Sequence, residues 1–290
     1  MTLQRTVTTP GPLLPFLLTA YPEVKKTKVR QWLKFGAVHV NGRSITKHNH
    51  ELHTGDQIDI KAQKPAPEGP KLPSGLRILH EDDHLIVLEK AAGWLTIAKD
   101  SGKGRNVYSV LTDHVRSANP KLKVWIVHRL DRETSGLIVF AKTEEAKHWL
   151  QEHWHEFEKR YQAVVEGAPP AASGTLRSHL DESNPMRVFS APKSEDTREA
   201  VTHYRVLKKA AGRALLELTL ETGRRHQIRV QLSDARCPVV GDTRYGAKTD
   251  PVMRLALHAC LLRFEHPLDG HEMQFESPLP KELANLVASP

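Results

Sequence analysis

The chain has 290 residues, 39% of them hydrophobic and 26% charged, which is enough for one large domain or for a medium domain with a smaller one. Its 42 Lys and Arg outnumber 34 Asp and Glu, and the resulting charge of +8 suits a polyanionic partner. The only cysteines, Cys237 and Cys260, are not at a metal-ligand spacing, so neither a disulfide framework nor a zinc site is indicated. No segment approaches the ~20 apolar residues of a membrane span. Because Pro12 and Pro15 interrupt the leucine-rich start, a secretory signal is not favoured and a cytoplasmic protein is predicted.

Residues 1–60 predict a small basic α+β domain. Gly36 is placed to end a helix, because glycine often lies just past a helical C-terminus. Asn41-Gly42 is a typical hairpin turn. The predicted elements are helices beginning at Leu13 and over Thr27–Phe35, and strands over Ala37–Val40 and Gln57–Ile60.

Basic side chains concentrate on this first unit. From Glu23 to Lys47 there are seven basic residues and one acid. A solvated surface would explain such charges, but their concentration on one helix and the turn after it favours contact with a phosphate backbone. The residues predicted to bind RNA are Lys25, Lys26, Lys28, Arg30, Lys34 and Arg43.

Residues 61–75 are rich in Pro, Lys and Gly and predict a semi-extended linker. The remaining residues, 76–290, predict a second domain in which strands dominate and helices do not alternate strictly with them. This pattern favours an α+β fold with a mixed, largely antiparallel sheet and helices packed around it. Neither G-x-G-x-x-G nor a phosphate-loop signature occurs, so no nucleotide cofactor is indicated.

The elements of the second domain are predicted from hydrophobic spacing. In the last predicted helix, Ile228 and Leu232 would face the core, while Arg225 and Arg229 would share another face. The predicted strands are paired strands around the turn Glu81–Asp83, then Tyr161–Gly167 and Ala214–Glu221; the helices are Val107–Arg116, Glu144–Lys159 and Arg225–Ala235; and Ser183–Glu199 is an exposed loop.

The segment Val127–Lys142 has the most informative pattern. Apolar residues precede and follow a charged turn, which predicts two short buried strands joined by a loop. Asp131 lies in this loop between Arg129 and Arg132. Spacing alone allows two interpretations: a reactive carboxylate on a rigid mount, or a turn residue that accepts backbone hydrogen bonds.

Two separated motifs resemble the RluA-like family of pseudouridine synthases. His128-Arg129-Leu130-Asp131 with Thr134-Ser135-Gly136 matches "HRLDxxTSG", and Gly223-Arg224 with His226-Gln227-Ile228-Arg229 matches "GRxHQIR". Residues 36–42 are similar to the "GxVxVNG" turn of an RNA-binding domain found in a ribosomal small-subunit protein. Further matches, in the same order as in the family, are Lys90 with Gly93, Lys159–Tyr161, Val239–Asp242, Tyr245-Gly246 and Leu257–Ala259.

The resemblance implies a role for each matching residue. Asp131 would be the essential carboxylate, Tyr161 would stack under the uracil and is a candidate base, and Arg229 would pair with the aspartate. Arg129 would fill the space left by the flipped base, and Ile228 would close the pocket. The motifs add His128, Arg224 and Gln227 as candidate substrate-binding residues. Two positions depart from the family pattern: Ala91 replaces a usual Pro, and Arg225 stands where Ser or Thr is common.

The implied reaction breaks the bond from ribose to nitrogen 1 of uracil, rotates the base and rejoins it through carbon 5. It involves no redox change and no group donor, so neither a cofactor nor a metal is expected. Asp131, kept ionised by Arg229, would attack carbon 1′ or remove the 2′ proton, and the sequence leaves both routes open. Tyr161 would then take the proton from carbon 5.

Several alternatives stay open for the partner and the activity. The expected partner is RNA, with large-subunit ribosomal RNA favoured over transfer RNA, and the protein is expected to be a monomer. A non-catalytic RNA-binding or ribosome-assembly factor is disfavoured by the joint presence of Asp131, Tyr161 and Arg229. Glycosidase-like hydrolysis is disfavoured because it usually requires two carboxylates and only one stands out.

Overall fold

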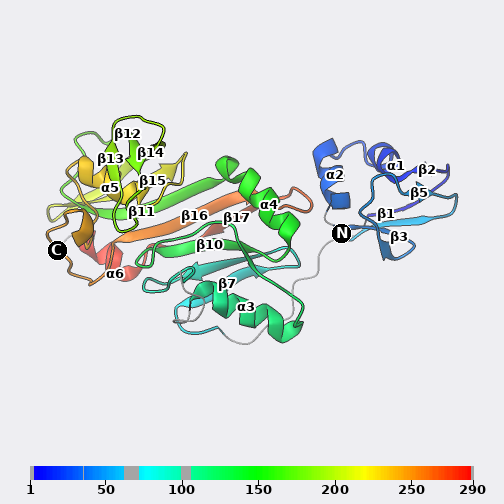
Figure 1. Ribbon diagram of the computed structural model, residues 1–290, viewed down its shortest axis with the longest axis horizontal. Coiled ribbons are helices and arrows are strands. Elements are labelled where there is room, and N and C mark those ends of the chain that lie inside the picture. The colour runs from blue at the N-terminus through cyan, green and yellow to red at the C-terminus, as the bar shows by residue number, and fades with distance from the viewer. Residues whose placement is uncertain (1–2, 35, 62–71, 99–105, 289–290) are drawn as a thin grey trace.

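The computed structural model describes residues 3–34, 36–61, 72–98 and 106–288. Most of the predicted linker and Phe35, the last residue of a predicted helix, lie outside these ranges. Residues 3–60 and residues 76–276 contribute to separate sheets, and the larger sheet runs through the middle of the second part (Figure 1).

The first part has a four-stranded sheet in the order β1-β6-β3-β4 and a two-stranded sheet of β2 and β5. Its helices α1 and α2 contribute Leu17 and Trp32 to the buried core. Asn41 and Gly42 both have positive φ, as the predicted Asn-Gly hairpin turn requires. The elements are β1 (Leu3–Thr6), β2 (Gly11–Pro12), α1 (Leu13–Ala20), α2 (Lys26–Lys34), β3 (Val38–Val40), β4 (Arg43–Ser44), β5 (Glu51–Leu52) and β6 (Gln57–Ile60).

The second part is built on an 11-stranded sheet in the order β13-β12-β14-β15-β11-β16-β10-β8-β7, with β17 paired to β16 and β9 to β10. Among the described strands, β10 pairs parallel with β16, and the other pairings are antiparallel. The prediction of a mixed, largely antiparallel sheet in an α+β fold is therefore confirmed. The strands are β7 (Leu76–Glu81), β8 (Leu85–Lys90), β9 (Trp125–Ile126), β10 (Ser135–Ala141), β11 (Glu158–Glu166), β12 (Ser173–Asp181), β13 (Phe189–Ala191), β14 (Thr197–Ala210), β15 (Arg213–Leu220), β16 (Leu257–Glu265) and β17 (Glu272–Glu276).

Helices and short 3-10 turns cover this sheet. They are α3 (Val107–Ala118), α4 (Glu144–Glu152), α5 (Gln227–Asp234), α6 (Lys281–Ala284) and the 3-10 turns Trp154–Glu156, Thr243–Tyr245 and Asn285–Val287. Figure 1 shows α3 and α4 on opposite sides of the strands around β10.

The continuous apolar runs in β8 and β10 follow from this two-sided cover. Successive side chains of a strand point to opposite faces, so a strand covered on both faces needs apolar residues at every position. Ile138 packs in the cluster that contains Leu111 of α3, while Val139 packs in the cluster that contains Leu150 of α4. All seven residues of β10 are buried, which gives the loop before it a rigid support.

Several predicted elements have different bounds in the structure. The helix predicted over Glu144–Lys159 ends at Glu152, because Phe157 stacks on Phe264 and the following residues pair with β16 instead. The predicted loop Ser183–Glu199 contains β13 and the start of β14. The helix predicted from Arg225 begins at Gln227, because His226 before it has a left-handed backbone conformation.

Candidate active site

The loop that carries Asp131 joins β9 to β10 and is held by buried polar groups. Lys90, at the end of β8, is fully buried, and its Nζ lies 3.0 Å from the carbonyl oxygen of Trp94 and 3.2 Å from those of Asp131 and Arg132. The hydroxyl of buried Thr96 donates to the carbonyl of Leu130 at 2.9 Å. Burial lowers the pKa of Lys90 to about 7, because the charged form is disfavoured away from water. Holding the loop therefore costs electrostatic free energy.

Gly136 is the second residue of β10, at the point where this strand meets β16. It pairs with Ala259 in the parallel ladder and has a φ of 113°. A Cβ at this position would lie 2.1 Å from the carbonyl oxygen of Ala259, so no other residue fits without moving backbone. The glycine of the first motif therefore allows the close strand contact that places Asp131 beside β16.

The structure brings Arg229 to Asp131 across 98 residues of sequence. Arg229 projects from α5, and its Nη1 donates to Asp131 Oδ2 at 3.0 Å. Its Nε and Nη2 donate to the two carboxylate oxygens of Asp242 at 2.7 and 2.8 Å, and the Asp242 side chain is only 2% exposed. Burial alone would lower the pKa of Arg229, but the two carboxylates raise it, so the guanidinium stays charged.

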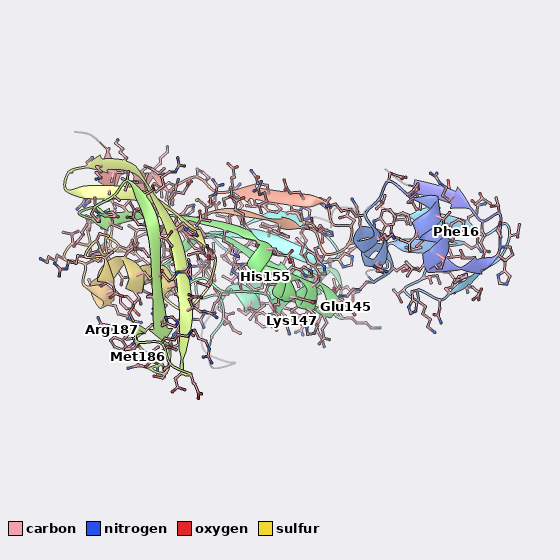
Figure 2. All side chains as sticks on the ribbon, turned by 90° about the horizontal axis from the view of Figure 1, so that it is seen from above. Phe16, Glu145, Lys147, His155, Met186 and Arg187 are labelled. Carbon is pink, nitrogen blue, oxygen red and sulfur yellow. The ribbon has the colours of Figure 1, made fainter. Side chains whose placement is uncertain are left out.

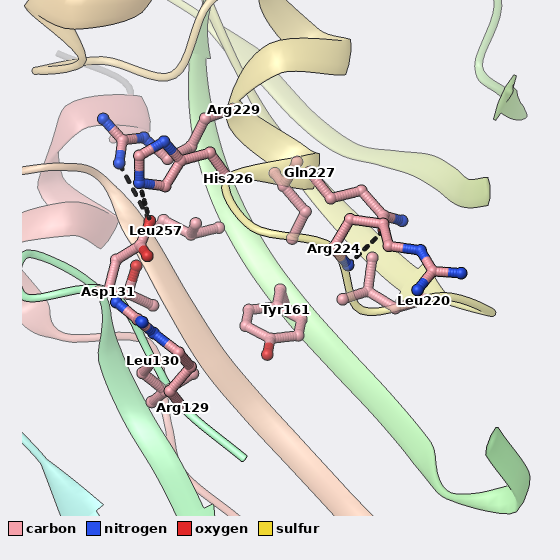
Figure 3. Close-up of a pocket in the computed structure, with 12 residues that line it drawn as sticks. Arg129, Leu130, Asp131, Tyr161, Leu220, Arg224, His226, Gln227, Arg229 and Leu257 are labelled. Carbon is pink, nitrogen blue, oxygen red and sulfur yellow. Dashed lines mark hydrogen bonds and ion pairs between the residues drawn. The ribbon is translucent and has the colours of Figure 1, made fainter. Parts of the chain in front are cut away.

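Asp131 lines a pocket with a volume of about 400 Å³, and this volume includes the solvent-filled entrance of the pocket. Figure 3 shows Arg129 and Asp131 on one side of Tyr161, and Leu220, Arg224 and Gln227 on the other. The remaining lining residues are Leu130, Thr134, His226, Ile228, Arg229 and Leu257. The combination of apolar walls, one carboxylate and several cations suits a flat polar ring attached to a phosphodiester chain.

Tyr161 lies on β11 and contributes to the wall of this pocket. Burial first, and then the charge of Asp131, raise the pKa of its phenol. The hydroxyl is therefore protonated at neutral pH, and it would have to pass its proton to a neighbour before it could accept another. The position suits a ring that stacks on a base.

Of the eight candidate catalytic and substrate-binding residues, seven line the pocket and His128 does not. His128 packs against Trp154 with ring centroids 4.2 Å apart, and its Nε2 accepts the backbone N–H of Val139 at 3.1 Å. Burial lowers the pKa of His128 to about 3, so the ring is neutral. It packs against the Asp131 loop on the side away from the pocket. We therefore do not retain His128 as a substrate-binding residue.

Gln227 and Arg225 have structural partners that the sequence did not indicate. The amide of Gln227 accepts from Arg224 N–H at 2.9 Å and donates to Val201 O at 3.0 Å, so it holds the turn before α5. Arg225 lies outside the helix and donates to the carbonyl oxygens of Glu182 and Pro185 at 2.9 Å. The prediction that Arg225 shares a helical face with Arg229 is therefore wrong.

Two residues at the site were missed by reasoning from the sequence. Asp242 was noted only as part of a matching motif, yet it holds Arg229 from the side away from Asp131. His226 was noted only as part of the second motif, yet its ring lies in the pocket beside Asp131. The signal for both was their place within motifs, and that signal does not specify a role.

A second group of titratable residues lies at the turn between β16 and β17. His266, Asp269 and His271 place potential metal ligands within 4.8 Å of one another. His266 Nε2 lies 3.0 Å from Asp82 Oδ2 and its Nδ1 lies 3.3 Å from Asp269 Oδ1. Although burial alone would lower the pKa of His266, Asp269 and Asp82 raise it. The backbone N–H of Leu268 also donates to His266 Nδ1 at 3.2 Å, so both ring nitrogens already have partners in the protein. We assign this group to the packing of two turns.

The predicted RNA contacts of the first part lie on or beside α2 and on β4. Lys25, Lys26, Arg30, Lys34 and Arg43 are exposed, and Lys28 is half-buried. Lys25 precedes α2, and Arg43 follows the Asn41-Gly42 turn.

Among the described residues, no helix is both long and apolar enough to cross a membrane.

Residues 84–234 match the model of the RNA pseudouridylate synthase family, and the chain belongs to that family. It is 34% identical over 281 residues to "Uncharacterized RNA pseudouridine synthase YlyB" of Bacillus subtilis (strain 168), with 94% of this chain and 91% of the relative covered.

Two further comparisons agree with the family. The chain is 32% identical over 286 residues to "Ribosomal large subunit pseudouridine synthase D" of Vibrio cholerae, with 92% of this chain and 87% of the relative covered. Among solved structures, it is similar to "Human RNA Pseudouridylate Synthase Domain Containing 4" with a TM-score of 0.60 and 26% identity, over 71% of this chain and 90% of that one. The predicted family and reaction class are thus confirmed.

Proposed function

We propose that this enzyme isomerises specific uridines of large-subunit ribosomal RNA to pseudouridine, with Asp131 as the catalytic carboxylate. The observation that carries the assignment of the site is the Asp131–Arg229 ion pair at a pocket walled by Tyr161. The ribosomal target is supported by the name of the Vibrio relative, which matches over nearly the whole chain. In this role the enzyme needs no cofactor, because the isomerisation rearranges one nucleotide and consumes nothing. We also propose that it works in the cytoplasm as a monomer.

The target can be tested by mapping pseudouridines in total RNA from a deletion strain and from a strain complemented with the gene. We expect one or a few positions of large-subunit ribosomal RNA to lose the modification and to regain it on complementation. Loss confined to transfer RNA would replace the proposed substrate by the alternative one. No lost position in either RNA would contradict the proposal as a whole.

The proposed roles within the pocket follow the geometry. Asp131 acts on the ribose or the uracil, and Arg229 holds its carboxylate in place. Tyr161 stacks on the base, Ile228 closes the apolar wall, and Arg129, which is exposed at the pocket, fills the position of the extruded base. Extrusion costs a few kcal/mol, and phosphate contacts by exposed cations such as Arg224 offset it.

Tyr161→Phe separates the two roles suggested for this residue. The phenyl ring keeps the stacking surface but removes the hydroxyl, so we expect RNA affinity within about twofold of wild type. If the hydroxyl takes the proton from carbon 5, kcat falls by about 100-fold or more, as expected for loss of a general base. Full turnover by Tyr161→Phe, measured by tritium release from 5-tritiated uridine in RNA, would leave Tyr161 with stacking alone.

We also propose that residues 1–60 are an RNA-binding domain joined through residues 61–75 to a catalytic domain of residues 76–290. Support comes from the separate sheets of the two parts and from the exposed basic side chains around α2. Such a domain would increase affinity for a large RNA without contacting the target base.

The double substitution Lys26→Glu and Arg30→Glu tests this role, since both side chains are exposed on α2. We expect Kd for ribosomal RNA to rise by about tenfold at physiological salt, and the dependence of affinity on salt to become less steep. Turnover on a short stem-loop substrate should stay unchanged. The control reverses two exposed charges on β14, Lys208 and Lys209. Equal losses in both variants would indicate a general charge effect and contradict a specific binding surface.

A further inference from the structure

His226 has an unusual backbone conformation for a residue with a side chain. It caps the start of α5 with a φ of 55° and ψ of 17°, in the left-handed region. Residues other than glycine persist there only when the surrounding structure holds them, and such positions concentrate at functional sites. Its side chain is 11% exposed and lines the pocket beside Asp131.

The hydrogen bonds of Tyr245 fix which ring nitrogen of His226 carries the proton. The backbone N–H of Val188 donates to Tyr245 Oη at 3.0 Å, so the hydroxyl hydrogen is directed elsewhere. The other partner of Oη is His226 Nδ1 at 2.8 Å. The hydroxyl therefore donates to Nδ1, and the proton of the neutral ring lies on Nε2.

Tyr245 is itself held in place by cations. The guanidinium carbon of Arg229 lies 4.9 Å from the centre of its ring and that of Arg187 lies 5.4 Å from it. Figure 2 shows Arg187 beside exposed Met186, in the segment between β12 and β13. The tyrosine is 3% exposed, so it forms a fixed support for the imidazole.

The protonated nitrogen of His226 faces the catalytic carboxylate. Nε2 lies 3.7 Å from Asp131 Oδ2, the same oxygen that accepts from Arg229 Nη1 at 3.0 Å. Burial lowers the pKa of His226; Asp131 opposes this, while Arg229, Arg225 and Arg244 act with burial. The ring is therefore neutral near pH 7 and presents a single N–H to Asp131.

We propose that His226 is a positioning residue for Asp131. When the target uridine enters, the Nε2–H of His226 forms a hydrogen bond with Asp131 Oδ2. Because Arg229 and His226 then both bind Oδ2, the other oxygen, Oδ1, is directed at the substrate. This role rests on the proposed function of Asp131. No proton is transferred, and the imidazole stays neutral throughout. Tyr245 determines the tautomer on which the contact depends.

A matched pair of substitutions tests the contact. In His226→Asn the amide oxygen still accepts from Tyr245, and asparagine tolerates left-handed backbone, but the side chain is too short to reach Asp131. In His226→Gln an amide N–H lies near the original Nε2. We expect His226→Asn to reduce kcat by about 10- to 100-fold, as for loss of one hydrogen bond to an ionised group, while KM for RNA stays within about twofold of wild type. His226→Gln should recover most of the lost kcat.

Wild-type kcat in His226→Asn would overturn the inference. An equal loss of kcat in His226→Asn and His226→Gln would also overturn it. A loss of kcat that is accompanied by a reduced Tm or a raised KM would do the same, because it indicates a structural role. If the wild-type enzyme makes pseudouridine and only this pattern fails, the proposed function stands without the positioning role.

A spectroscopic measurement keeps the inference testable even if no RNA is modified. Nitrogen-15 NMR of histidine-labelled protein, with the His226 signals assigned from His226→Asn, reports the tautomer directly. We expect the proton on Nε2, and a lower pKa of His226 in Asp131→Asn, since the carboxylate raises that pKa in the wild type. A proton on Nδ1, or a pKa that does not change in Asp131→Asn, would overturn the contact.

Discussion

Replacing Asp131 by Asn is expected to reduce kcat by about 1,000-fold or more, while Kd for RNA changes by no more than a few-fold. The amide has the same shape and can still accept from Arg229, so the pocket keeps its form. It cannot act as a nucleophile or as a base at the ribose. The measurement is tritium release from 5-tritiated uridine in RNA, with affinity followed by filter binding.

The control for this variant is Asp113→Asn, which changes the same charge on the exposed side of α3. It should retain wild-type turnover. If Asp131→Asn released tritium at the wild-type rate, Asp131 would not be the catalytic carboxylate, and its contact with Arg229 would be structural.

The second large effect is expected at Asp242. Its carboxylate is buried and binds Arg229 through two hydrogen bonds, so Asp242→Ala leaves a largely buried guanidinium with Asp131 as its remaining ion-pair partner among the described residues. Removing one partner of a buried pair costs about 3–5 kcal/mol of unfolding free energy. Turnover should also fall by about tenfold or more, because Arg229 is no longer held in position beside Asp131. Urea unfolding and single-turnover kinetics measure the two effects.

Glu282→Gln is the matched control, because it breaks a pair with Arg254 in which the carboxylate side chain is 50% exposed and the Nη1–Oε1 distance is 3.2 Å. A half-exposed pair contributes at most about 1 kcal/mol, since water screens it and competes for both groups. Similar losses of stability in the two variants would show that burial of Asp242 does not determine the effect.

Much of the fold was predictable because hydrophobic spacing reports burial directly. The fully buried β10 and the amphipathic α3 follow from their own residues, and the motif glycine Gly136 marks a close contact of strands. The family resemblance added what spacing cannot supply, namely that Asp131 and Arg229 belong to one site although 98 residues separate them.

The remaining errors occur where tertiary contacts override local pattern. Trp154 and Phe157 continue the apolar stripe of α4, yet rings from β16 and from the Asp131 loop bind them outside the helix. Because His226 has a left-handed backbone conformation, α5 begins only at Gln227. Histidine has no strong preference for this conformation, so the sequence did not indicate it. The role of Asp242 required the position of Arg229, which only the folded chain provides.

Lys90 has a consequence for how the enzyme uses the energy of RNA binding. Because the buried amino group of Lys90 binds carbonyl oxygens of the segment after β8 and of the Asp131 loop, the Asp131 loop becomes ordered when the chain folds and not when RNA arrives. Fixing the backbone of a free loop costs about 1–2 kcal/mol for each residue. An enzyme with a preordered loop does not repeat that cost at each encounter, and the contacts made with the phosphate chain can act on the nucleotide itself, drawing one uridine out of its stack.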